Sequence, residues 1–195
     1  MNKFCLAMLL LLGACHAAGD RAAVEKPPLA GAAIGGPFAL TDQNGRAVTD
    51  RAFSGRYRIM YFGYTFCPDV CPTDVAAIGA AVKLLDASNP ALAARIVPIF
   101  VTVDPVRDTP AVVKQFVSAF HPRMVGLTGS PAAVAATAKE FAVYFSKGTP
   151  SPDGGYLVNH SRQAYLIDTD GKPLALLPVE QGPQAVATEI ERWAR

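Results

Sequence analysis

Two cysteines four positions apart, Cys67 and Cys71, are the residues whose type and spacing best suit chemistry. They follow an apolar, strand-like stretch and stand just before Pro72, a residue common in the first turn of a helix. A helix start favours the thiolate, the form of cysteine that binds soft metals and attacks disulfides. Three intervening residues, against two in the usual thioredoxin redox motif, let the sulfurs converge on one ion and also let them oxidise together. The pair therefore predicts either a metal site or a redox-active dithiol.

A metal site needs a third ligand from elsewhere, because two thiolates alone leave a metal under-coordinated. The chain offers three histidines, His16, His121 and His160. His121 precedes Pro122 at the end of a predicted helix, where a surface or capping role is expected. His160 lies between two extended segments, where a loop could project it toward the cysteines or leave it solvated. The residues alone leave these alternatives open.

The amino terminus has the pattern of an export signal. Residues 1–14 place Lys3 before an apolar run and then small residues, and the run is shorter than the roughly 20 residues that span a bilayer. The residues Leu12-Gly13-Ala14-Cys15 resemble the bacterial lipobox, so we expect Cys15 to be lipidated and to become the new amino terminus. The alternative is an ordinary signal peptide cut near Ala18, with Cys15 incidental. The pattern predicts an exported protein, lipid-anchored to a bacterial membrane, whose domain faces the periplasm or the cell exterior.

The rest of the chain is expected to be a tether followed by one domain. Residues 16–35 are rich in Ala, Gly and Pro with scattered charge, which is typical of a flexible linker. The expected division is a signal peptide at 1–14, a lipidated cysteine and tether at 15–33, and a folded domain at 34–195. A chain of 195 residues with 51% hydrophobic residues suits one compact domain. The net charge is +2 without a run of like charges, so we expect no nucleic-acid partner.

Strands and helices alternate along this domain. Asn44-Gly45 predicts a hairpin turn between short strands at 38–41 and 46–49. Buried strands are expected at 58–66 and 96–103, and further extended segments at 124–127, 156–158, 163–168 and 174–177. Helices are expected from Pro72 to just before Asn89 and at 109–120, 130–141 and 183–193. This order predicts an α/β fold with a thioredoxin-like mixed central sheet, helices on both faces and an N-terminal β-hairpin. A small doubly wound domain fits the periodicity equally well, and the cysteines favour the first.

Three stretches in order along the chain carry a more specific signal: YFGYTFCPDVCP at 61–72, VTVDPVRDTP at 101–110, and VNHS at 158–161 with YLID at 165–168. They resemble the successive motifs of the Sco/SenC proteins, thioredoxin-fold copper chaperones for cytochrome c oxidase assembly. The resemblance runs from about Ile34 to the end of the chain. It implies that Cys67, Cys71 and His160 are copper ligands. It also implies an acceptor, cytochrome c oxidase subunit two or another copper-site protein, and an upstream copper donor.

The donor set agrees with copper independently, because two thiolates and an imidazole suit Cu(I) and an added weak ligand can hold Cu(II). One departure is Asn159, where family members often carry an acid before the histidine; the loss of charge affects any outer tuning of the imidazole. Several neighbours receive weaker predictions. Asp69 and Asp74 are expected to interact favourably with the helix dipole, to tune the thiols or to form a docking surface. Asp104, Arg107 and Asp108 are expected to form a turn network or to act directly in function. Met60 and Met124 are expected to pack in the core, and Tyr64 and Phe66 to shield the site from solvent.

Two functions fit these residues. The first is a membrane-tethered copper chaperone that delivers its ion to the dinuclear copper site of cytochrome c oxidase subunit two. The second is a thiol-disulfide oxidoreductase that reduces the acceptor's cysteines with Cys67 and Cys71 as the redox pair, so whether the chain is an enzyme stays open. His160 discriminates between them, because disulfide exchange needs the thiols alone and copper capture needs the imidazole too. Peroxide reduction with Cys67 as the attacking thiolate ranks lower, since no separate resolving cysteine is evident beyond Cys71.

Overall fold

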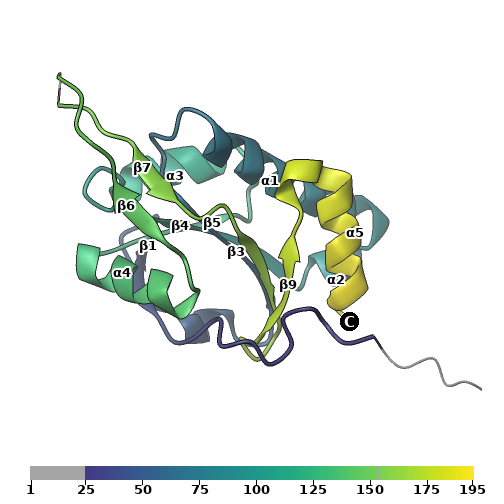
Figure 1. The fold of residues 1–195 in the computed structure, drawn as a ribbon. Coiled ribbons are helices and arrows are strands. Elements are labelled where there is room, and N and C mark those ends of the chain that lie inside the picture. Colours follow the sequence, from purple (N-terminus) through teal and green to yellow (C-terminus); the bar gives the residue numbers. More distant parts are fainter. Residues whose placement is uncertain (1–24, 153) are drawn as a thin grey trace, which may run out of the picture.

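The computed structural model describes residues 25–152 and 154–195 (Figure 1). The predictions for residues 1–14, for lipidation of Cys15 and for His16 lie outside these ranges. Within them, no helix has both the length and the apolar character that crossing a bilayer requires. The elements are β1 (Ala39–Asp42), β2 (Ala47–Thr49), the 3-10 helix η1 (Asp50–Phe53), β3 (Tyr57–Gly63), α1 (Val70–Ser88), α2 (Pro90–Ala93), β4 (Ile96–Thr102), α3 (Pro110–Ser118), β5 (Val125–Thr128), α4 (Pro131–Glu140), β6 (Phe145–Lys147), β7 (Val158–His160), β8 (Ala164–Ile167), β9 (Pro173–Leu177), the 3-10 helix η2 (Val179–Gln181) and α5 (Pro183–Trp193).

The body of the fold is one mixed sheet with the strand order β2-β1-β5-β4-β3-β8-β9. Every residue of β3 and β4 is buried, and the two strands pair in parallel from Tyr57 opposite Ile96 to Gly63 opposite Thr102. Strands buried on both faces read as continuous runs of β-branched and aromatic residues, which is how 58–66 and 96–103 were recognised. Strand β8 is antiparallel to β3, so the sheet is mixed as expected.

Helices cover both faces of this sheet, and alternate side chains of β3 show which helix lies where. The Tyr61 hydroxyl reaches Asp74 on α1, whereas the Phe62 ring packs on Phe141 at the end of α4, with ring centroids 5.3 Å apart. Helix α5, yellow in Figure 1, packs along α1. Thr109 and Ser130 cap α3 and α4 through side-chain oxygens that accept from backbone N–H groups. The predicted arrangement of sheet and helices is confirmed.

The N-terminal hairpin is also as predicted. Strands β1 and β2 pair antiparallel with Ala39 opposite Thr49, and Gly45 has a φ of 79°, a conformation that glycine adopts without steric cost. The Asp42 side chain accepts hydrogen bonds from the backbone of Asn44 and Arg46 and fixes the turn. Strand β1 then pairs antiparallel with β5, which attaches the hairpin to the sheet.

Two features differ from the sequence-based expectation. Strands β6 and β7 form a separate two-stranded antiparallel sheet in which Phe145 pairs with His160 (Figure 1). Three-residue strands so far apart in sequence carry no turn signal, so this pairing was missed. The second feature is the segment before Ile34: the Leu29 backbone N–H donates to the Leu174 carbonyl at 2.9 Å, and Leu29 packs against the core. Contacts with the body therefore begin before residue 34.

Candidate metal centre

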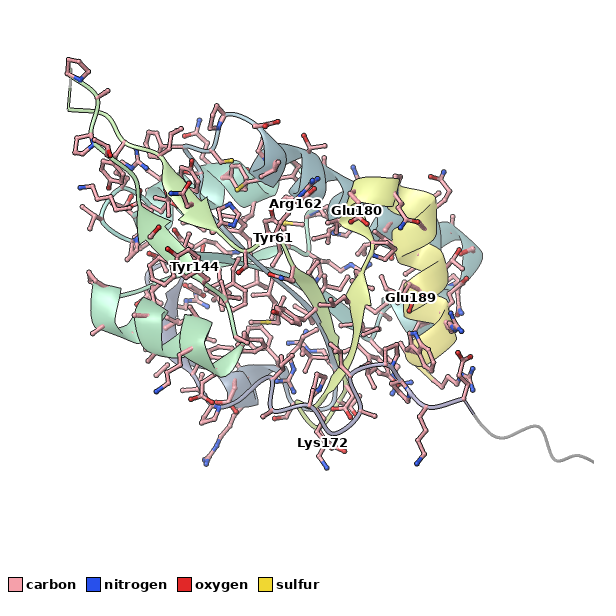
Figure 2. All side chains as sticks on the ribbon, viewed as in Figure 1. Tyr61, Tyr144, Arg162, Lys172, Glu180 and Glu189 are labelled. Carbon is pink, nitrogen blue, oxygen red and sulfur yellow. The ribbon has the colours of Figure 1, made fainter. Side chains whose placement is uncertain are left out.

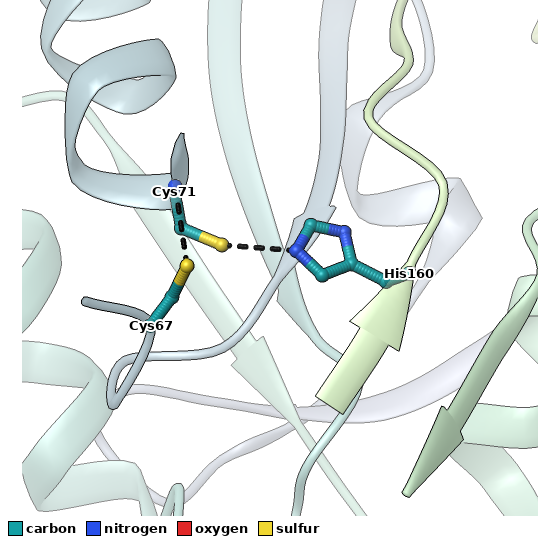
Figure 3. Close-up of side chains that lie close together, drawn as sticks. All are labelled: Cys67, Cys71 and His160. Atoms are coloured by element: carbon teal, nitrogen blue, oxygen red, sulfur yellow. Dashed lines mark hydrogen bonds between the residues drawn. The ribbon is translucent and has the colours of Figure 1, made fainter. Parts of the chain in front are cut away.

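Cys67, Cys71 and His160 meet at one point of the fold (Figure 3). Cys67 lies in the loop after β3, Cys71 in the first turn of α1, and His160 at the end of β7 rather than in a loop. One donor atom from each lies within 4.8 Å of the other two. The Cys71 Sγ is 3.1 Å from the His160 Nε2, and the Cys71 backbone N–H donates to the Cys67 Sγ at 3.5 Å. The structure thus brings together all three residues predicted as ligands.

The imidazole of His160 is held with its free nitrogen toward the thiols. Its Nδ1 lies 2.9 Å from the Ser161 carbonyl, which can only accept, so Nδ1 carries the proton and donates. In the neutral ring this leaves a lone pair on Nε2, the atom that faces Cys71. The ring also meets Tyr64 edge-on, with centroids 5.9 Å apart. A backbone carbonyl therefore fixes the tautomer that a metal ligand requires.

The two thiols have different electrostatic environments. Burial opposes ionisation of Cys67, but N–H groups of Cys71, Asp69 and Val70 at the helix start outweigh it, so the pKa of Cys67 is below its ordinary value. Cys71 is fully buried, and this burial raises its pKa to about 12. The expectation that the helix start favours thiolate is therefore right for Cys67 and wrong for Cys71. At neutral pH the Cys71 thiol keeps its proton, which points to the His160 Nε2.

A glycine makes room for the buried thiol. A Cβ atom at Gly63 would stand 2.9 Å from the Cys71 Sγ and 3.2 Å from the Phe100 ring, and the first contact is closer than real Cβ atoms come. Gly63 is the last residue of β3, just before the cysteine loop begins. Close packing against the Cys71 thiol therefore explains why a glycine stands at position 63, and Gly63 belongs to the site.

Asp74 forms a buried charge network beside the thiols. Both carboxylate oxygens are engaged by Arg162, whose Nε donates at 2.7 Å and Nη2 at 2.6 Å, and the Tyr61 hydroxyl donates at 3.0 Å (Figure 2 labels Tyr61 and Arg162). Asp74 has 0% exposure, so the predicted docking surface does not hold for this acid. Hydrogen bonding to Asp74 raises the pKa of Arg162. Arg162 was missed; its only signal was a basic residue two positions after a candidate ligand histidine.

The middle motif forms a network that supports the cysteine loop without contacting the donor atoms. Buried Asp108 accepts from the Thr65 N–H at 3.0 Å and from the hydroxyls of Thr65 and Thr102, both at 2.6 Å. These bonds tie the start of the cysteine loop to the end of β4. Arg107 donates to Asp104 and to the Tyr156 carbonyl, and the Tyr156 hydroxyl donates to Asp104 at 2.9 Å. Of the two readings offered by the sequence, the turn network is the one observed.

Comparisons with known proteins place the chain in a family. A family model described as SCO1/SenC matches residues 26–195. The chain belongs to the SCO1/SenC family. The mitochondrial SCO1 homolog 1 of Arabidopsis thaliana is 42% identical over 149 residues, which cover 76% of this chain and 43% of the relative. The chain spans about half the length of the curated relatives it matches.

Solved structures place the SCO1/SenC chain in the expected fold class. The copper-bound ScoI of Bradyrhizobium japonicum superimposes with a TM-score of 0.74 at 41% identity, covering 82% of this chain and 99% of that one. A thioredoxin domain of a thiol-disulfide oxidoreductase from Bacteroides vulgatus gives a TM-score of 0.57 at 14% identity, covering 83% and 96%, a likeness of fold alone. The thioredoxin-like architecture is confirmed.

The remaining predicted residues of this SCO1/SenC chain divide by burial. Met60 and Met124 are in the core as expected, and Tyr64 is buried against His160. The Phe66 side chain is 53% exposed, so it shields the thiols less than predicted. Asn159 is exposed opposite Ser146 and Asp69 is exposed before α1. His121 is buried rather than on the surface, with its Nδ1 accepting from the Arg123 N–H at 3.2 Å and its Nε2 3.4 Å from the Asp86 carboxylate.

Proposed function

We propose that this chain binds copper through Cys67, Cys71 and His160 and passes it to the dinuclear copper site of cytochrome c oxidase subunit two or to another copper-site acceptor. The convergence of two thiols and one imidazole within 4.8 Å carries the proposal. Copper-bound ScoI supports the choice of metal. The choice of acceptor rests on membership of the SCO1/SenC family. A further neighbour, BsSco, is a member of the Sco family of cytochrome c oxidase assembly proteins, and at 24% identity it is a likeness of fold alone.

The chemistry of the donor set fits copper as cargo. Thiolate and imidazole are ligands that Cu(I) prefers, and a weak additional ligand would accommodate Cu(II). Cys71 holds its proton when the site is empty of metal, since burial raises its pKa to about 12. Loading must therefore release that proton, and the cysteines must be reduced. The ready thiolate of Cys67 provides the first point of attachment.

Exposure sets the direction of transfer. Cys71 is fully buried, whereas Cys67 and His160 are each partly exposed. An acceptor thiolate therefore approaches from the side of Cys67 and His160 and replaces one of these ligands while Cys71 still holds the ion. In such a ligand exchange the metal is never free.

We further propose that a lipid on Cys15 anchors the chain to a bacterial membrane after export, with residues 16–33 as the tether. The domain then faces the periplasm or the cell exterior, and an upstream protein donates the copper. The lipobox-like residues at 12–15 support this part of the proposal. Mass spectrometry of the chain from membranes tests it, because a diacylglycerol mass on an N-terminal peptide beginning at Cys15 is expected, and an unmodified peptide beginning near Ala18 contradicts it.

The test of copper binding is an anaerobic Cu(I) titration of the reduced full-length chain in detergent against a competing chelator, with His160→Ala beside it. One tightly bound copper per chain is expected, weakened at least about tenfold by the substitution, which is about 1.4 kcal/mol. His121→Ala is the matched control, since His121 has its own partners, the Arg123 N–H and the Asp86 carboxylate, and is not among the three donor residues. Binding that ignores His160 would contradict the proposal.

A thiol-disulfide oxidoreductase is the second candidate, favoured by one specific observation. Cys67 combines partial exposure with a lowered pKa, as an attacking thiol requires, and buried Cys71 stands next to it as a resolving thiol. This activity needs no imidazole ligand. If His160→Ala retains disulfide exchange and the wild-type chain binds copper only weakly, the oxidoreductase replaces the chaperone as the function.

A further inference from the structure

We propose that Arg162 is a positioning residue that holds His160 at the thiols through its two-pronged ion pair with buried Asp74. The inference deepens the proposed function and rests on it, since it concerns how one copper ligand is kept in place. It starts from how the segment that carries His160 is joined to the rest of the fold.

The segment with His160 belongs to a two-stranded sheet that makes no strand pairing with the main sheet in the described part of the chain. Its strands have three residues each, and an isolated hairpin of this size has little stability of its own. Val158 packs in the core on one side of His160. On the other side, two residues further on, the Arg162 side chain makes the ionic contact with the body.

The partner of Arg162 determines what that contact fixes. Asp74 lies three positions after Cys71 on α1, so both side chains emerge from the same side of the helix one turn apart. Arg162 Nε and Nη2 bond separate oxygens of this carboxylate at 2.7 and 2.6 Å. A guanidinium held at two points is restrained in orientation as well as in distance. The pair therefore ties the histidine segment to the turn of α1 that carries Cys71.

Tyr61 ties the same carboxylate to the sheet. Its hydroxyl donates to Asp74 Oδ2 at 3.0 Å, and Asp74 has 0% exposure, so the carboxylate cannot move without losing all three bonds. A fixed Asp74 makes a fixed point for Arg162, and Arg162 in turn limits where His160 can lie. The imidazole is thereby placed 3.1 Å from Cys71 before any ion arrives. A ligand ordered in advance loses less conformational entropy when the metal binds.

The test compares four variants of the full-length chain. Arg162→Leu removes the pair, and Arg162→Lys keeps the charge without the two-pronged geometry. The double variant Asp74→Asn with Arg162→Leu removes the pair without leaving an unpaired buried carboxylate. The amide oxygen introduced at position 74 can still accept the hydrogen bond from the Tyr61 hydroxyl. Arg123→Leu is the matched control, because Arg123 also pairs with a carboxylate, Asp86, away from the thiols. Unfolding curves identify which variants fold.

Two readouts decide the inference, each measured on folded variants. The first is the Cu(I) affinity, measured with and without the additional substitution His160→Ala. We expect the double variant Asp74→Asn with Arg162→Leu to bind Cu(I) about tenfold more weakly, which is the usual effect of removing an outer partner of a metal ligand. In the His160→Ala background the same double variant should weaken binding no further. The second is the apo-protein imidazole ¹H–¹⁵N NMR spectrum, assigned with His160→Ala, in which the His160 signals should move or broaden in every variant at position 162 and not in Arg123→Leu.

Other outcomes overturn the inference. If the Arg162 variants weaken copper binding equally with and without His160, or leave both affinity and the apo His160 signals unchanged, Arg162 does not position the imidazole. Failure of the proposed function looks different: the wild-type chain then binds no tight copper, or binds it independently of His160. The apo NMR readout still decides the position of the imidazole in that case, because it involves no metal.

Discussion

The Cys71 Sγ and the His160 Nε2 lie 3.1 Å apart although 89 positions separate the two residues in the chain. The contact joins the first turn of α1, a helix on one face of the main sheet, to the end of β7, which belongs to the separate two-stranded sheet. The thiol is fully buried and the imidazole is partly exposed. This pair is the inner part of the proposed copper site, and Cys67 completes it from the loop between β3 and α1.

Replacing Gly63 with alanine should disturb this contact directly. The new methyl group would stand 2.9 Å from the Cys71 Sγ, so either the thiol or the strand must move. We expect Gly63→Ala to lower stability by about 1–3 kcal/mol, as overpacking typically does, and to weaken Cu(I) binding. Gly129→Ala is the control, since its nearest neighbour is a flexible Leu40 methyl at 3.1 Å. Unfolding in urea and chelator competition measure both effects; a Gly63→Ala chain as stable and as tight as wild type would show that the thiol has room.

The two cysteines should react with iodoacetamide at different pH. The pKa of Cys67 is below its ordinary value and that of Cys71 is about 12, and the thiolate is the reactive form. In the reduced apo protein Cys67 should therefore be alkylated first near neutral pH, while Cys71 stays protected. Mass spectrometry of peptides after short exposures across pH 5 to 9 measures the order. Equal rates at the two cysteines would contradict the difference in environment.

Stability should fall at alkaline pH because of Cys71. Its pKa rises from the ordinary 9.0 to about 12 on folding, so between these values the folded chain binds more protons than the unfolded chain. A raised pKa contributes stability that is complete below pH 9 and is lost as the pH rises toward 12. We expect the free energy of unfolding of the apo chain to decline over this range more steeply than that of Cys71→Ala. Parallel declines in the two chains would exclude Cys71 as the cause.

Asp108 should matter for the loop and not for the ion. Its carboxylate accepts three hydrogen bonds from Thr65 and Thr102, and an amide at this position can accept with one oxygen only. Asp108→Asn is expected to cost about 1–3 kcal/mol of stability. Exposed Asp170→Asn, the control, should stay within about 0.5 kcal/mol of wild type. Urea unfolding measures both, and a neutral Asp108→Asn would mean that the network does not hold the cysteine loop.

Introducing an acid in place of Asn159 should change the Cu(I) affinity little. The Asn159 side chain is exposed, and its neighbour across the β6–β7 pair is Ser146 rather than a ligand. A charge in water is screened, so we expect Asn159→Asp to alter the Cu(I) affinity by less than about threefold at physiological salt. Chelator competition at low and high salt is the measurement. A tenfold change in the Cu(I) affinity that persists in high salt would contradict this prediction and show that the charge at position 159 acts on the copper site.

Local signals account for what the sequence predicted correctly. The nearly uncharged runs of β3 and β4, the turn at Gly45 and the caps Thr109 and Ser130 depend on residues close together in the chain. Their patterns could therefore be recognised from the sequence alone. The thiol pair was readable for the same reason. The contact of Leu29 with Leu174 could not be predicted from the sequence, because it is made across the fold.

The sequence by itself determined the cysteine spacing, the alternation of strands and helices and, through three motifs, the family. Only the tertiary structure decided that His160 ends a paired strand with Nε2 toward Cys71, that Cys71 is too buried to ionise readily, and that Asp74 pairs with Arg162 instead of facing water. The physical reason is the distance along the chain over which each effect acts. Propensity, capping and periodicity act between near neighbours, whereas burial and charge pairing depend on which distant residues the folded chain brings together.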